Sequence, residues 1–121
     1  MGLDATIRTI DTDASNPVDR YLRGTVALAT FRKFYPLHKW IVDNIAGANV
    51  SYVDNYPVIV EAELSANDIK RAYAHIADMF GVSADIDNAR GDDDLVRLRN
   101  VYKYAIARGA DTPCVYYGGD C

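Results

Sequence analysis

The residues best suited to chemistry lie between positions 32 and 40, where two cations, an imidazole and an indole follow one another closely. Arg32 and Lys33 precede a second group, which consists of His38, Lys39 and Trp40. Guanidinium and ammonium groups can hold a phosphate, an imidazole titrates near neutral pH, and an indole can stack on a base. The segment is therefore a candidate binding site for a nucleotide or for a protein partner.

Ordinary structural roles account for part of the same segment. Trp40 shares a helical stripe with Leu37 and Ile41, which predicts a position in the core. His38 lies off that stripe. Its role stays open: it could be a surface residue, donate a hydrogen bond to another residue of a site, or bind a ligand itself. The two cations before it are equally typical of solvated surface charge.

The chain contains nine tyrosines, which form the second candidate surface. Exposed tyrosines supply a large contact area at a low cost in conformational entropy, and they are enriched where proteins bind one another. Core packing and half-buried sheet positions are the alternative. The tyrosines expected in loops or at strand ends are Tyr52, Tyr56, Tyr116 and Tyr117.

The segment Asp85–Asp94 has the oxygen-rich composition of a calcium loop but not its spacing. An EF-hand loop needs glycine at its sixth position and a glutamate at its twelfth, whereas Arg90 stands sixth from Asp85 and apolar residues follow the acids. Helix capping by residues 92–94 and loop solvation explain the same side chains. We expect no metal ion.

Other chemical signatures are weak. Cys114 and Cys121 have Gly118 and Gly119 between them and could close a small loop, but a structural disulfide is not favoured in a cytosolic protein, and neither cysteine has a metal-ligand neighbour. The chain has no glycine-rich phosphate loop, zinc-protease motif or serine elbow. Catalysis and a cofactor are therefore not expected.

The N-terminal half predicts two strands, a helix and a further strand. Residues 3–10 alternate as a half-buried strand does, and residues 24–31 carry the β-branched and apolar character of a second one. A short helix begins near Pro36 and is closed by Gly47, residues 49–55 are turn-like, and residues 58–63 form a strand.

The C-terminal half predicts two helices and allows one last strand. Ser65 and Asp68 are spaced as a capping box, and apolar residues then follow at helical spacing to Gly81. A second helix follows the acids at 92–94 and ends near Arg108, and residues 113–117 could form the strand. The predicted fold is α+β, with a small, mainly antiparallel sheet packed by about three helices.

Length and charge set the outer bounds. A chain of 121 residues is long enough for a single domain, residues 1–121, with one core. Its net charge of −4 makes nucleic acid an unlikely partner. The absence of a long apolar run and of a secretory signal favours a cytoplasmic protein without membrane contact.

Two stretches of the chain form short motifs. The first is Met1-Gly2-Leu3-Asp4; the second is Phe31-Arg32-Lys33 followed by Leu37-His38, any residue, and Trp40-Ile41. These motifs resemble those of a family of small uncharacterised bacteriophage proteins, whose members typically begin with the first motif and carry the second at this spacing. The chain departs from the family pattern after Asp4, where Ala5-Thr6 replaces a larger Met-aromatic pair.

The resemblance implies a phage accessory protein in the host cytoplasm. The leading hypothesis is a non-enzymatic binder or inhibitor of a host protein, components of antiviral defence included. It would act through Arg32, Lys33, His38, Lys39 and exposed tyrosines. One alternative is a protein that binds or sequesters a nucleotide or small ligand; a third is a small enzyme that pairs His38 with a distant carboxylate such as Asp4.

Overall fold

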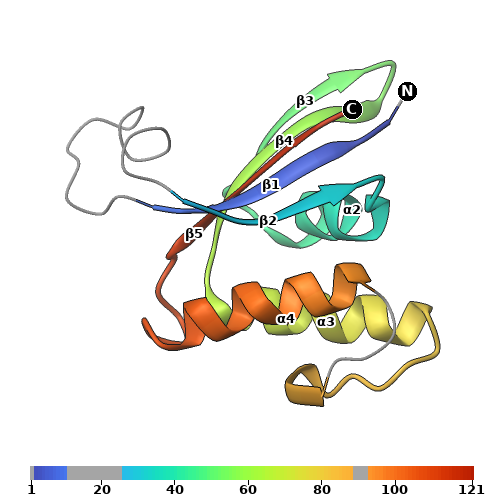
Figure 1. Ribbon diagram of the computed structural model, residues 1–121. Helices are drawn as coiled ribbons and strands as arrows, with labels where there is room; N and C mark the ends of the chain where they lie inside the picture. Colours follow the sequence, from blue (N-terminus) through green and yellow to red (C-terminus); the bar gives the residue numbers. More distant parts are fainter. Residues whose placement is uncertain (1, 11–25, 89–92) are drawn as a thin grey trace.

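The computed structural model describes residues 2–10, 26–88 and 93–121, which build one antiparallel sheet with helices on one of its faces (Figure 1). The strands are arranged in the order β2-β1-β5-β4-β3. They are β1 (Asp4–Thr9), β2 (Ala27–Arg32), β3 (Asn49–Val53), β4 (Tyr56–Leu64) and β5 (Val115–Asp120). The helices are α2 (Tyr35–Asn44), α3 (Ala66–Met79) and α4 (Asp93–Ile106), with a 3-10 turn η1 (Ile86–Asn88). The α+β prediction is confirmed.

The core lies between the sheet and the helices because alternate strand residues point to the same face. On β4, for example, Val60, Ala62 and Leu64 are buried, whereas Glu61 between them is exposed. Helices α2 and α3 contact each other, α3 packs on α4, and α4 contacts β2. Within the described residues no helix is long and apolar enough to cross a membrane.

Strand β5, which the sequence indicated only as a last short strand, is the central strand of the sheet. It is paired with β1 on one side and β4 on the other. It also extends through Gly118 and Gly119, beyond the predicted residues 113–117. Cys114 and Cys121 lie just outside its two ends, about 23 Å apart for an extended chain, and both thiols are free.

The prediction of a turn over residues 49–55 is wrong. Residues 49–53 form β3, and only Asp54 and Asn55 turn, with positive φ angles of 51° and 65° that suit a tight hairpin. The side chains of this strand are largely exposed and bury little surface. The strand therefore forms through its pairing with β4. Because most of its residues are exposed, β3 lacks the buried apolar face that marks a half-buried strand.

The predicted helices are present, with small shifts at their ends. Pro36 lies in the first turn of α2, and Ile45 caps its end. Both halves of the capping box form on α3: the Ser65 hydroxyl accepts the Asp68 N–H, and the Asp68 carboxylate accepts the Ser65 N–H. Gly81 after α3 has a φ of +69°, as its role at the helix end predicted.

Two of the predicted segments include residues that the structure does not describe. The predicted start of the second strand, residue 24, lies outside the described residues, and β2 begins at Ala27. The same is true of residues 89–92 in the calcium-like segment. In its described part, the Asp85 carboxylate accepts the backbone N–H of Asp87 at 3.1 Å, and no group of three potential metal ligands occurs among the described residues.

Candidate functional site

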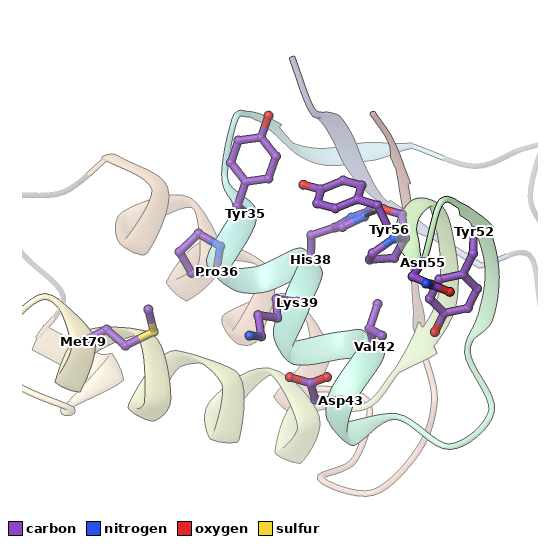
Figure 2. A pocket seen from close by; sticks show the side chains of 11 residues that line it. Tyr35, Pro36, His38, Lys39, Val42, Asp43, Tyr52, Asn55, Tyr56 and Met79 are labelled. Carbon is purple, nitrogen blue, oxygen red and sulfur yellow. Dashed lines mark hydrogen bonds between the residues drawn. The ribbon is translucent and has the colours of Figure 1, made fainter. Parts of the chain in front are cut away.

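A groove of about 580 Å³ runs over the outward side of α2, between the β3–β4 hairpin and the end of α3 (Figure 2). Helix α2 supplies its middle, the hairpin one wall, and Met79 on α3 the other margin. Tyr35 lies at the start of α2, and Tyr56 and Tyr52 lie on the hairpin side. The lining residues are Tyr35, Pro36, His38, Lys39, Val42, Asp43, Tyr52, Asn55, Tyr56, Pro57 and Met79.

Four of the candidate residues from the sequence come together in this groove, namely His38, Lys39, Tyr52 and Tyr56. Sequence reasoning missed the others. Tyr35 could have been found, because Tyr35, Lys39 and Val42 recur at i, i+4 and i+7 on one side of α2. Met79 carried no comparable signal, since its approach to α2 depends on how the two helices pack.

His38 is buried, with 2% of its surface exposed, and it joins three elements. Its Nδ1 lies 2.9 Å from the Tyr117 hydroxyl on β5, and its Nε2 lies 3.1 Å from the Pro57 carbonyl on β4. A carbonyl can only accept, so Nε2 carries the proton and Nδ1 accepts from the tyrosine. Burial lowers the pKa of His38, an effect that the bond to Pro57 partly opposes. The ring is therefore neutral at pH 7.

The expectation that Tyr117 is exposed is wrong. Its side chain is fully buried because β5 is the central strand and Tyr117 faces the helices. Burial raises the pKa of Tyr117 far above its usual value, so the hydroxyl stays a donor to His38. A Cβ on Gly119 would lie 2.6 Å from the Tyr117 hydroxyl and 2.7 Å from His38 Nδ1. Only glycine leaves room for this contact.

Cys121 lies beside the same histidine without forming a nucleophilic pair with it. Its Sγ is 4.0 Å from His38 Nε2, and its side chain is hydrogen-bonded to that of Tyr56. A catalytic pair needs an imidazole nitrogen free to take the thiol proton. Nε2 already carries a proton, and burial raises the pKa of the Cys121 thiol. The geometry holds the thiol in its protonated, weakly nucleophilic form.

The hypothesis of a catalytic pair between His38 and Asp4 has no support in the geometry. Asp4 is exposed and precedes the inward-facing Ala5 on β1. Ala5 pairs with Gly119, the residue against which His38 packs. Because successive strand residues point to opposite faces, Asp4 and His38 lie on opposite sides of the sheet.

Arg32 and Lys33 are not among the groove-lining residues. Both are exposed at the end of β2, and Arg32 Nε lies 3.8 Å from an Asp4 carboxylate oxygen with 83% of its side chain exposed. Lys33 has a φ of 58°, and its backbone N–H donates to the Leu3 carbonyl. We call this pair the basic turn. It is a separate candidate surface.

Tyr116 also lies away from the groove. It follows the buried Val115 and precedes the buried Tyr117 on β5, so it points to the face of the sheet opposite the helices. Its hydroxyl donates to Glu61 on the neighbouring strand. The predicted tyrosine surface therefore divides, with only Tyr52 and Tyr56 in the groove.

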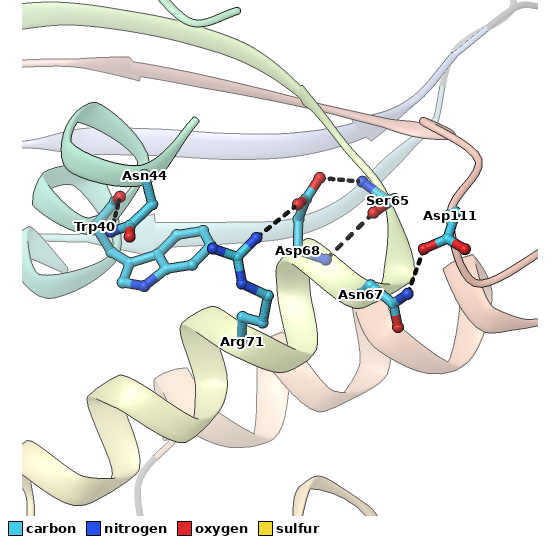
Figure 3. Close-up of polar contacts among 7 residues, drawn as sticks. All are labelled: Trp40, Asn44, Ser65, Asn67, Asp68, Arg71 and Asp111. Atoms are coloured by element: carbon cyan, nitrogen blue, oxygen red, sulfur yellow. Dashed lines mark hydrogen bonds and ion pairs between the residues drawn. The ribbon is translucent and has the colours of Figure 1, made fainter. Parts of the chain in front are cut away.

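Trp40 has the core position that its spacing predicted, with 6% of its surface exposed. The Arg71 guanidinium from α3 lies 5.4 Å from the centre of the indole ring, and it also pairs with Asp68 at 3.7 Å (Figure 3). This cation–π contact joins α2 to α3. Trp40 therefore holds the helix that carries the groove and is not available to stack on a ligand there.

Comparisons with protein-family models, curated proteins and solved structures found no match for this chain.

Proposed function

We propose that this protein is a non-enzymatic binding protein, and that the groove over α2 receives a segment of a partner protein. The observation that carries this proposal is the gathering of exposed apolar side chains in one place. Tyr52 is 57% exposed, Tyr56 48% and Met79 57%, and all three line the groove together with Tyr35. Large exposed side chains of these types that share one concavity are typical of protein-binding surfaces.

The chemistry around the groove supports binding more than catalysis. Both ring nitrogens of His38 are hydrogen-bonded, one to Tyr117 and the other to Pro57, so the imidazole joins α2 to β5 and β4. The neighbouring Cys121 thiol has a raised pKa. Neither group is prepared to accept a proton from a substrate.

A nucleotide or another small phosphorylated ligand is the alternative, and the charges of the groove support it less. Phosphate binding favours an excess of cations. Among the described lining residues Lys39 is balanced by Asp43, and the basic turn lies elsewhere. The alternative requires Arg32 and Lys33 to form a site of their own.

The two sequence motifs support a setting for this activity. Because they resemble those of small bacteriophage proteins, we propose a phage accessory protein that binds a host protein in the host cytoplasm. An inhibitor of an antiviral defence component is the form of this proposal that we favour. His38 and Trp40 of the second motif are both buried. These two residues of the motif would therefore stabilise the fold around the groove.

The test is to capture ligands from host lysate on tagged protein and divide the eluate for protein and small-molecule mass spectrometry. We expect one host protein in stoichiometric amount from the wild type and its loss from Tyr56→Ala. Tyr116→Ala, the same truncation on the opposite sheet face, is the control and should retain it. Recovery of a nucleotide without a protein would overturn the proposal.

A further inference from the structure

The polar groups that line the groove can both donate and accept hydrogen bonds. Lys39 can only donate, and the hydroxyl of Tyr52 and the amide of Asn55 both include donors. Asp43 is the one carboxylate among the described lining residues. The ring nitrogens of His38 are already used within the protein. The groove can therefore donate to several carbonyl oxygens of a ligand, and Asp43 can accept from a cationic group.

Most of the apolar lining consists of stiff, flat rings, and Val42 and Met79 supply the rest. Tyr35 and Pro36 come from the first turn of α2, and Tyr56 and Pro57 come from the first two residues of β4. Figure 2 shows the Tyr35 and Tyr56 rings beside the N-terminal end of α2, with Tyr52 farther along the hairpin. These side chains lose little conformational entropy on binding, and they suit a ligand with flat apolar rings.

A partner α-helix fits these features less well than an extended chain. A helix uses its carbonyls internally and offers few acceptors to Lys39 or to the Tyr52 hydroxyl. A polyproline II segment has no internal hydrogen bonds, so its carbonyls point outward. Its prolines lack N–H groups and present apolar rings, and its stiffness lowers the entropic cost of binding.

We propose that the groove binds a proline-rich segment of the partner in the polyproline II conformation, with a basic residue beside Asp43. The orientation follows from the charges on α2, where Lys39 and Asp43 are both exposed and stand one helical turn apart. A basic residue of the ligand is attracted to Asp43 and repelled by Lys39, which fixes the direction of the bound chain. This inference rests on the proposed function and specifies the class of its partner.

The test uses an oligoproline peptide of about ten residues led by an arginine, with a fluorophore at its far end, titrated with the full chain. The matched control peptide replaces the prolines by glycine and serine and keeps the arginine. We expect saturable binding of the oligoproline alone. Tyr35→Ala and Tyr56→Ala should each weaken it about tenfold or more, whereas Tyr116→Ala should leave it unchanged.

The orientation has its own test. Asp43→Asn should weaken binding of the arginine-led peptide about three- to tenfold and leave an oligoproline without arginine unaffected. An equal effect on both peptides would overturn the placement of the basic residue at Asp43.

Three results would overturn the inference as a whole: no binding at millimolar peptide, equal binding of the glycine-serine peptide, or affinities unchanged in both tyrosine variants. The proposed function has a separate outcome. If Tyr56→Ala loses a captured host protein while the oligoproline fails to bind, the groove is a protein-binding site and only the proline-rich class is wrong.

Discussion

The two sides of helix α2 show how one short segment divides its chemistry. On the inward side, His38 and Trp40 are buried and engaged with partners from β4, β5 and α3. On the outward side, Tyr35, Lys39 and Asp43 are exposed along the groove. Helical geometry thus places the imidazole, the most reactive side chain of the helix, in contacts that hold the fold together and leaves its neighbours exposed along the groove. Residues adjacent in sequence can therefore have different roles.

A large effect is expected when the space beneath His38 is filled. Gly119→Ala would place a methyl group within 2.7 Å of both His38 Nδ1 and the Tyr117 hydroxyl, and we expect a loss of about 2–4 kcal/mol in the free energy of unfolding. Chemical denaturation measures it. Gly118→Ala is the control, because its added Cβ meets only a Tyr116 ring carbon at 3.5 Å. Equal losses in the two variants would contradict a crowded inward side.

A smaller effect is expected when the hydrogen bond to His38 is removed without changing the ring that carries it. Tyr117→Phe leaves the buried Nδ1 without its donor, and we expect a loss of about 1–3 kcal/mol in the free energy of unfolding. Tyr52→Phe removes the same hydroxyl from an exposed ring and should have almost no effect. If the two variants unfold alike, the Tyr117 hydroxyl does not hold the histidine.

The neutral state of His38 predicts a dependence of stability on pH. Above about pH 6.5 the ring is neutral in both the folded and the unfolded chain, so it contributes no pH dependence. As the pH falls below that value, the unfolded chain takes up a proton that folded His38, with its lowered pKa, does not. Stability is therefore lost until the folded pKa is reached.

Thermal unfolding between about pH 7 and pH 5.5 measures this loss. His38→Gln lowers stability at both values but should show a smaller loss on acidification than the wild type. A loss as large in the variant as in the wild type would show that other groups cause it.

The smallest effect on stability is expected on the outward side of α2. Lys39→Ala removes an exposed side chain and should change the free energy of unfolding by no more than about 0.5 kcal/mol. On the inward side, Ile41→Ala removes fully buried methyl groups and should cost about 2–5 kcal/mol. A comparable loss in both variants would remove the distinction between the two sides.

Local signals in the sequence were enough to predict most of the fold. The capping box at Ser65, the apolar stripe of α3 and Gly81 after it all lie within a few turns of one another, and each acts locally. The central position of β5 could not be predicted this way, because it depends on pairing with β1 and β4, which are far away along the chain. Strand β3 likewise forms through its partner.

The site was predictable by residue type but not by arrangement. His38, Lys39, Tyr52 and Tyr56 were candidates because of their chemistry, and all four line the groove. Tyr117 was assigned to the surface because nothing local shows that it contacts His38, which lies 79 positions earlier in the chain. Side chains that meet across a sheet carry no spacing signal, so exposure is the property that sequence reasoning judged least well.

The central claim is that the groove, and not the basic turn, binds the partner. The most direct test measures the affinity of the captured partner protein by calorimetry for two double variants, Tyr35→Ala with Tyr56→Ala and Arg32→Ala with Lys33→Ala. We predict that the groove variant loses at least about thirtyfold in affinity, about 2 kcal/mol, while the basic-turn variant stays within about threefold of the wild type. The reverse pattern would contradict the account and place binding at the basic turn.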